Sequence, residues 1–135
     1  MHENNIVHCD IKPSNIIINN NHLKLIDFGS CCILENNKSY DNSEYETFLG
    51  TEGYMAPEQY HYKIYYSTDI YSLCVCITEI LVGKLWYEED NYFYSRQELL
   101  NSINNLTKYR SILFKGVSEN HLLRPSLDNI QKIFL

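Results

Sequence analysis

The chain has 135 residues, of which 44% are apolar and 13% aromatic, and its formal net charge is −6. This size suits one domain with a packed core, and the acidic balance without basic clusters argues against a nucleic-acid partner. No apolar run approaches the roughly 18 residues of a membrane span, and residues 1–5 lack the features of a signal peptide, so we expect no membrane association and a cytoplasmic protein.

The first half of the chain alternates short apolar runs with polar turns. Three isoleucines at 16–18 precede three asparagines at 19–21 and a second apolar run at 23–26. This pattern predicts two short strands joined by an Asn-rich turn. Residues 35–47 are polar and acidic, which predicts a surface loop.

The second half is predicted to be helical. Ser67 or Thr68 can cap a long helix, and Asp69 suits its positive N-terminal end. The residues up to position 82 are apolar nearly all round, so we expect this helix to be buried all round, with Gly83 as its C-terminal cap. Further helices are predicted at 95–105, 106–115 and, after Ser126, 127–134.

The five cysteines lie at positions 9, 31, 32, 74 and 76. They form no CxxC pair and are odd in number, so neither a zinc site nor a disulfide framework is expected. We expect reduced, partly buried thiols in a cytosolic compartment.

Three short motifs carry chemistry, and each of them alone is weak evidence. They are His8-Cys9-Asp10-Ile11-Lys12-Pro13-Ser14-Asn15, Asp27-Phe28-Gly29 and Ala56-Pro57-Glu58. Their order and spacing match the catalytic loop, the metal-binding segment and the end of the activation segment of protein kinases. The chain therefore resembles the C-terminal lobe of a eukaryotic-type serine/threonine protein kinase, a mainly α (α+β) fold with a small β-hairpin that bears the catalytic loop and the metal-binding segment. On this view residues 1–135 form one partial kinase domain, with the activation segment at 27–58.

The resemblance implies phosphoryl transfer from ATP to a protein hydroxyl with Mg²⁺ as the metal. Asp10 would accept or orient the proton of the substrate, and Lys12 would offset the charge of the transferring phosphate. Asn15 and Asp27 would hold Mg²⁺, which prefers oxygen ligands, and Ile17 would form the floor under adenine.

The resemblance also assigns supporting roles near the site. His8 would pack near Phe28 and bond to the backbone, and Gly29 would let the chain turn after the metal-binding aspartate. Asp69 would be a buried anchor whose carboxylate accepts backbone N–H bonds from the catalytic loop. Thr51 would bond the catalytic residues from the substrate-facing loop, which fits serine/threonine kinases better than tyrosine kinases.

Two further expectations concern side chains away from the catalytic loop. Glu58 and Arg124 resemble a buried ion pair of the family, and removing either partner is expected to cost roughly 3–5 kcal/mol. The remaining histidines show no partner pattern and are expected at the surface; they are His2, His22, His61 and His121.

The first departure from the family pattern is Cys9, which stands where most kinases have an arginine. That arginine receives an activation-loop phosphate, and a thiol cannot do so. The loop also carries Asp41, Glu44 and Glu46 against Lys38. A phosphate added there would meet like charges, so we expect no phosphorylation switch of the usual kind.

The second departure is that no glycine-rich loop, strand lysine or pairing glutamate precedes Asp10. The helix that normally precedes the catalytic loop is also missing, which would leave about four large apolar side chains bare and forfeit roughly 6–12 kcal/mol. We therefore expect weak ATP and Mg²⁺ binding, low activity and marginal stability for this chain alone.

Three functions remain open at this point. The chain could belong to a working kinase whose other parts lie elsewhere. It could instead be a catalytically silent half-kinase (a pseudokinase) that docks onto a full kinase or an N-lobe partner as scaffold or inhibitor. The third alternative is a fragment without function.

Overall fold

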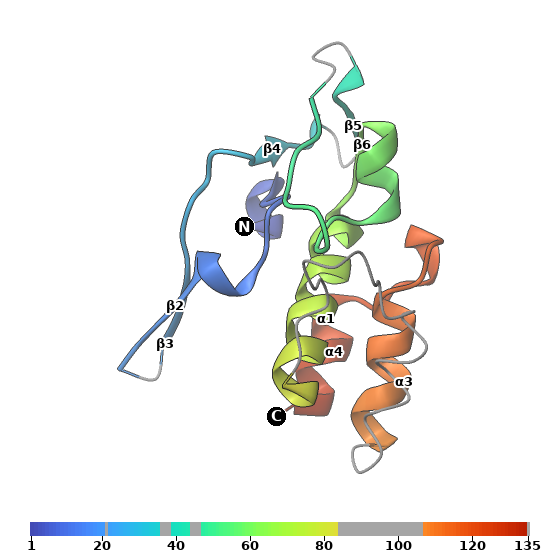
Figure 1. The fold of residues 1–135 in the computed structure, drawn as a ribbon. Helices are drawn as coiled ribbons and strands as arrows, with labels where there is room; N and C mark the ends of the chain where they lie inside the picture. Colours follow the sequence, from blue (N-terminus) through green and yellow to red (C-terminus); the bar gives the residue numbers. More distant parts are fainter. Residues whose placement is uncertain (21, 36–38, 44–46, 84–106, 135) are drawn as a thin grey trace, which may run out of the picture.

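The computed structural model describes residues 1–20, 22–35, 39–43, 47–83 and 107–134. Short strand pairs dominate the N-terminal half and helices the C-terminal half (Figure 1). The α-helices of the described residues run roughly side by side in Figure 1, and they are α1 (Tyr66–Val82), α3 (Thr107–Gly116) and α4 (Leu127–Phe134). Their facing apolar side chains form the main core.

Helix α1 is the centre of this core, and its burial follows from its sequence. Ile70, Cys74 and Val75 are buried against residues of α3 and α4. Gly116 lets α3 approach closely, because a Cβ atom there would collide with the side chain of Cys74. Burial all round was expected but is wrong at Ile80, which is 71% exposed.

The start of α1 differs from the prediction. The helix begins at Tyr66, so Ser67 and Thr68 lie inside its first turn instead of capping a helix that begins at Asp69. The Thr68 hydroxyl, as the third helical residue, accepts a hydrogen bond from the Tyr65 N–H at 3.0 Å. At the other end Gly83 is the predicted cap, with φ of 69° and its N–H on the Glu79 carbonyl.

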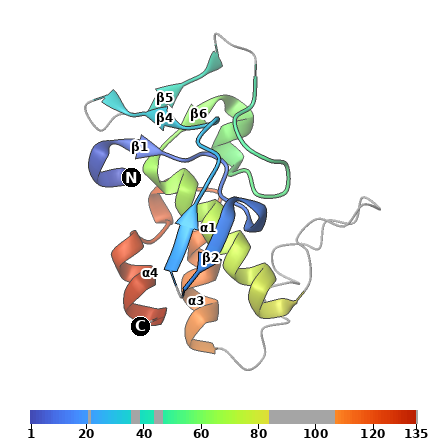
Figure 2. The same cartoon turned by 90° about the vertical axis from the view of Figure 1, so that its left-hand side faces the viewer.

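In the described part of the chain the strands form three antiparallel pairs, which are β1 (Ile6–Val7) with β4 (Cys32–Ile33), β2 (Ile16–Asn19) with β3 (His22–Leu25), and β5 (Tyr40–Asp41) with β6 (Lys63–Ile64). The hairpin of β2 and β3 is present as predicted, and Figures 1 and 2 show it to one side of α1. Strand β5 corrects the prediction that 35–47 is only a loop. Its pairing with β6, more than twenty residues away, has no local sequence signal.

The remaining helices agree with the sequence where they are described. Helix α3 lies one residue later than the helix predicted at 106–115, and α4 spans the predicted 127–134. At the start of α4 the Asn129 N–H donates to the Ser126 hydroxyl at 3.3 Å. The predicted helix at 95–105 lies outside the described residues. Among the described helices, none is long and apolar enough to cross a bilayer.

Candidate active site

The Asp10 carboxylate lies at the centre of the site and is 8% exposed. Its Oδ2 accepts a hydrogen bond from Asn15 Nδ2 at 3.1 Å and pairs with Lys12 Nζ at 2.9 Å. Its Oδ1 is buried and has no hydrogen-bond partner among the residues that the structure describes. One carboxylate oxygen is thus held in place while the other is unpaired.

A second segment, far along the chain, meets the catalytic loop at Lys12. The ammonium of Lys12 donates to the Thr51 hydroxyl at 2.6 Å. Gly50 makes the approach possible, because it has φ of 117° and a Cβ atom there would lie 2.7 Å from the Cys9 carbonyl oxygen. The loop expected to face substrate therefore contacts Lys12, which in turn pairs with the Asp10 carboxylate.

Backbone hydrogen bonds tie the segment before Asp27 to the catalytic loop. The Ile26 N–H donates to the Asn15 carbonyl at 3.0 Å, and the Ile26 carbonyl lies 3.1 Å from His8 Nε2. Asp27 itself has φ of 62°, is exposed, and accepts the Gly29 N–H on Oδ1 at 3.2 Å. These contacts place the start of the Asp27 segment beside the element that carries Asn15.

Two apolar side chains near the Asp27 segment, those of Phe28 and Ile17, are partly or largely exposed. The ring of Phe28 lies 5.5 Å from that of His8, centroid to centroid, and Phe28 is 56% exposed. Ile17 follows the catalytic loop on β2 and is half exposed. Its apolar side chain is therefore accessible from outside the protein.

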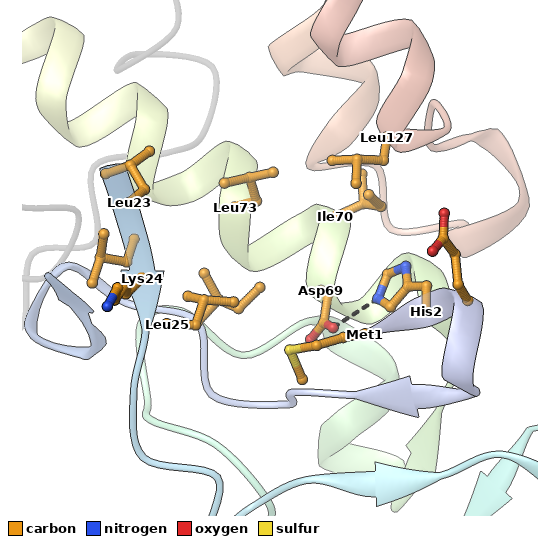
Figure 3. Close-up of a pocket in the computed structure, with 12 residues that line it drawn as sticks. Met1, His2, Leu23, Lys24, Leu25, Asp69, Ile70, Leu73 and Leu127 are labelled. Atoms are coloured by element: carbon orange, nitrogen blue, oxygen red, sulfur yellow. Dashed lines mark hydrogen bonds and ion pairs between the residues drawn. The ribbon is translucent and has the colours of Figure 1, made fainter. Parts of the chain in front are cut away.

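Asp69 on α1 holds the backbone of the catalytic loop. Its two carboxylate oxygens accept the N–H groups of His8 and Cys9, each at 2.9 Å. Oδ2 also lies 2.8 Å from Nε2 of His2 (Figure 3). The expectation that His2 is a surface residue without a partner is therefore wrong, and His121 is a second exception because its ring stacks on Tyr65 at 3.8 Å.

Glu58 and Arg124 form a two-pronged ion pair, with N–O distances of 2.6 and 2.7 Å. The Thr68 hydroxyl donates to the same carboxylate at 2.8 Å. Burial acts to raise the pKa of Glu58, but the hydrogen bonds and charge of Arg124 outweigh it, so the pKa lies below its usual value of 4.5. The pair connects the end of the activation segment to the turn before α4.

Two polar contacts near the site were not predicted from the sequence. Gln59 Nε2 donates to the Cys9 carbonyl at 2.9 Å and to the Leu49 carbonyl at 2.5 Å, which joins the catalytic loop to the activation segment. The Tyr54 hydroxyl donates to Glu79 on α1 at 2.9 Å, and burial together with this carboxylate raises the pKa of Tyr54. Both contacts join residues that are far apart in the sequence, so no local sequence pattern predicts them.

An apolar pocket of about 490 Å³ lies between the hairpin and α1 (Figure 3). Leu23, Lys24 and Leu25 line it from β3, and Ile70 and Leu73 line it from α1. Within the described part of the chain, no group of three or more histidine, cysteine, aspartate or glutamate side chains could hold a metal ion together.

The chain resembles known proteins along nearly its whole length. The family description "Protein kinase domain" matches residues 1–131. The chain is 38% identical to mitogen-activated protein kinase kinase 1 of Arabidopsis thaliana over 107 residues, which cover 76% of the chain and 29% of that protein. It is 33% identical to serine/threonine-protein kinase shk1/pak1 of Schizosaccharomyces pombe over 141 residues, which cover 93% of the chain and 20% of that protein.

A third relative is the Aurora kinase of Eremothecium gossypii, at 42% identity over 97 residues, which cover 67% of the chain and 24% of that protein. The chain thus spans less than a third of the length of these curated relatives.

Proposed function

The chain belongs to the protein kinase family, and from that premise we propose that residues 1–135 are the catalytic-loop part of a serine/threonine protein kinase, a transferase that moves a phosphate from ATP to a protein hydroxyl. The unpaired oxygen of Asp10 is the observation that carries this proposal. A buried acceptor without a hydrogen bond costs free energy, so a group that fills it is bound favourably.

Asp10 is suited to receive the hydroxyl of the substrate. Its Oδ2 is fixed by Asn15 and Lys12, which leaves Oδ1 as the acceptor for an incoming O–H. An acceptor held in one orientation can align the attacking oxygen and take its proton as the bond to phosphorus forms. Asp10 is therefore the catalytic residue of the proposed reaction.

Lys12 and Thr51 supply the charge and the alignment on the other side of Asp10. The ammonium lies between the Asp10 carboxylate and the Thr51 hydroxyl, at 2.9 and 2.6 Å. A cation in that position offsets negative charge on a transferring phosphate. The pairing of Thr51 with Lys12 supports a serine/threonine kinase, which the sequence pattern of this loop also favours.

The residues present fit Mg²⁺ and ATP. The Asn15 amide nitrogen donates hydrogen bonds to Asp10, so its oxygen can bind a cation. The exposed Asp27 carboxylate is a second oxygen ligand. When bound, Mg²⁺ would neutralise charge on the phosphates of ATP. The apolar side chain of Ile17 would contact the base.

A second candidate function is a binding role. The 135 residues contain no GxGxxG motif, and they expose an apolar pocket between the hairpin and α1. We propose that residues 1–135 alone transfer phosphate weakly or not at all. A catalytically silent chain of this kind would act as a scaffold or an inhibitor by docking onto a full kinase or an N-lobe partner. In either case we place the protein in the cytoplasm with a protein substrate or partner.

The test is an Asp10→Asn variant of the full-length protein in a phosphotransfer assay. We expect the rate to fall by about 10²–10⁴-fold, because the amide is a far weaker proton acceptor, while Mg²⁺-dependent nucleotide binding stays unchanged. The labelled residues on a protein substrate should be phosphoserine and phosphothreonine. The matched control is Asp128→Asn, an exposed change on α4.

The two candidate functions predict different outcomes of this assay. An unchanged rate in Asp10→Asn would contradict the catalytic role. An inactive wild-type protein whose inhibition of a partner kinase survives Asp10→Asn would establish the binding role instead.

A further inference from the structure

Two cysteines that the proposed reaction does not use lie together in the smaller core. Cys9 is 1% exposed and Cys32 is 6% exposed, and both pack in one apolar cluster with Val7, Leu34 and Ile64. Cys9 directly precedes the catalytic Asp10, and Cys32 opens the short strand that follows the Asp27 segment. A bond between these two residues would connect both parts of the candidate active site.

The strand pairing brings the two thiols within reach of each other. Val7 is the direct cross-strand partner of Cys32, and the Cys9 thiol turns back to the Val7 carbonyl at 3.6 Å. Cys9 lies two residues beyond Val7, just after β1 ends, and its side chain packs in the same buried cluster as that of Cys32. The left-handed backbone of Cys9, with φ of 67°, redirects the chain at this point.

Each thiol also affects the ionisation of the other, because the Cys32 side chain raises the pKa of Cys9 and the Cys9 side chain lowers the pKa of Cys32. The thiolate is the form that reacts with oxidants. Cys32 is also the more exposed thiol of the pair, at 6% against 1%, so we assign it the first reaction.

The other cysteines are poor partners for Cys9. Cys74 and Cys76 lie on α1, where Cys74 belongs to the main core and Cys76 contacts the Ile11 carbonyl, and burial raises the pKa of each to about 12. Cys31 is the half-buried neighbour of Cys32, and burial raises its pKa. Cys31 lies just before β4, and the cluster that holds Cys9 does not include it among the described residues.

We propose that Cys9 and Cys32 form a reversible internal disulfide when the protein meets a peroxide. The Cys32 thiolate attacks one peroxide oxygen, which breaks the O–O bond, leaves a sulfenic acid on Cys32 and, after protonation, releases water. The Cys9 sulfur then attacks the Cys32 sulfur, and the displaced hydroxide takes the Cys9 proton to leave as a second water. The peroxide is reduced by two electrons and the two thiols are oxidised to one disulfide.

The disulfide would restrain the segment between Cys9 and Cys32. The closed segment carries Asp10, Asn15 and Asp27, so the bond fixes the residue before the catalytic aspartate to the strand after the metal-binding segment. Any thiol reductant would reverse the change. The inference does not depend on catalysis, because it concerns only the thiols and the strand pair β1–β4.

The test is peptide mass spectrometry without reduction on the folded full-length protein after graded hydrogen peroxide. We expect a linked peptide pair joining Cys9 to Cys32 as the main product and its disappearance after dithiothreitol. Cys31→Ser is the matched control and should leave the linked pair unchanged, whereas Cys32→Ser should abolish it. Oxidation in denaturant should give a mixture of pairings, because the fold no longer selects the partner.

Three results would overturn the proposal. They are free Cys9 and Cys32 thiols when Cys31 is already oxidised, a main product that joins Cys31 to either residue, and the same mixture of pairings in the folded and denatured protein. If Cys32→Ser fails to fold, the wild-type comparison between the folded and denatured states still decides the question. A failed phosphotransfer assay would leave this result unaffected.

Discussion

Single buried polar side chains hold the catalytic loop in shape, and Asp69 is the clearest of them. Its carboxylate accepts the N–H groups of His8 and Cys9 and the ring of His2, and it is 5% exposed. Both oxygens are needed because the His8 and Cys9 N–H groups donate to different ones, and the His2 ring shares Oδ2 with His8. An amide offers only one acceptor, so a buried donor would be left unsatisfied.

The Asp69→Asn variant should therefore lower the free energy of unfolding by about 1–3 kcal/mol. Urea denaturation followed by tyrosine and tryptophan fluorescence measures this difference. Asp128→Asn, at an exposed position, should change it by less than about 1 kcal/mol. Equal stabilities of wild type and Asp69→Asn would show that this carboxylate is not an anchor.

The Glu58–Arg124 pair makes a prediction about pH. The pKa of Glu58 is lower in the folded than in the unfolded chain, so the unfolded chain binds more protons below the usual pKa of 4.5. The stabilisation is complete above that pH and decreases as the pH falls through the folded pKa. Glu58→Gln should cost roughly 3–5 kcal/mol at neutral pH, because Arg124 would be left buried without its counter-charge.

Urea denaturation of Glu58→Gln and wild type across acidic pH checks this prediction. The difference between them should shrink as the pH falls below 4.5, because Glu58 gains its proton first in the unfolded chain and only at the lower folded pKa in the native protein. Glu52→Gln, an exposed carboxylate, is the control and should behave as wild type. A difference that stays constant down to low pH would contradict the assigned cause.

The sequence identified most of the candidate site at this scale and missed a defined part of it. Asp10, Lys12 and Thr51 follow from motif spacing, and the structure brings them into contact. His2 and Gln59 were missed because their partners lie far along the chain, and a lone histidine or glutamine carries no spacing signal.

At the scale of elements, the periodic segments were predictable and the two-residue strands were not. Helix α1 was found because apolar residues recur through it, but its start was placed late because Thr68 acts inside the first turn. Strands β4 and β5 are too short for periodicity to appear. Such strands are fixed by their partner strand and by burial around it, which only the folded chain supplies.

The pairing of β5 with β6 bears on regulation of the activation segment. Lys63 on β6 forms an ion pair with Asp41 on β5, and this hydrogen bond lowers the pKa of Asp41. The lysine is thus already engaged by a carboxylate. Cys9, where the family has an arginine, is buried in the small core and offers no positive charge.

We therefore predict that phosphorylation of the exposed Thr47 does not activate the protein. Phosphotransfer by the full-length protein should be the same before and after phosphatase treatment, because Lys63 already pairs with Asp41 and Cys9 has no positive charge to receive the phosphate. Thr47→Ala should match wild type. A several-fold loss of activity on dephosphorylation, reproduced by Thr47→Ala, would contradict this prediction.

At the scale of the whole molecule, residues 1–135 expose more apolar surface than their core can easily balance. Among the residues that the structure describes, four large apolar side chains are each more than 70% exposed, and they are Ile18, Leu23, Ile80 and Leu122. Covering each of them would contribute roughly 1.5–3 kcal/mol, or about 6–12 kcal/mol together. That sum is comparable with the whole stability of an ordinary domain.

The last prediction follows from this exposed surface and the pocket beside it. Residues 1–135 on their own should bind the dye ANS in native buffer, self-associate at micromolar concentration and unfold without a sharp transition. Leu73→Gln, at a half-buried pocket position, should reduce dye binding while leaving the helical signal intact, because the new amide reaches water. Val75→Gln is its matched control on the same helix and should unfold the chain, because that position is fully buried in the main core. A monomer that unfolds cooperatively at about 60 °C without binding the dye would show that the exposed apolar side chains do not destabilise residues 1–135.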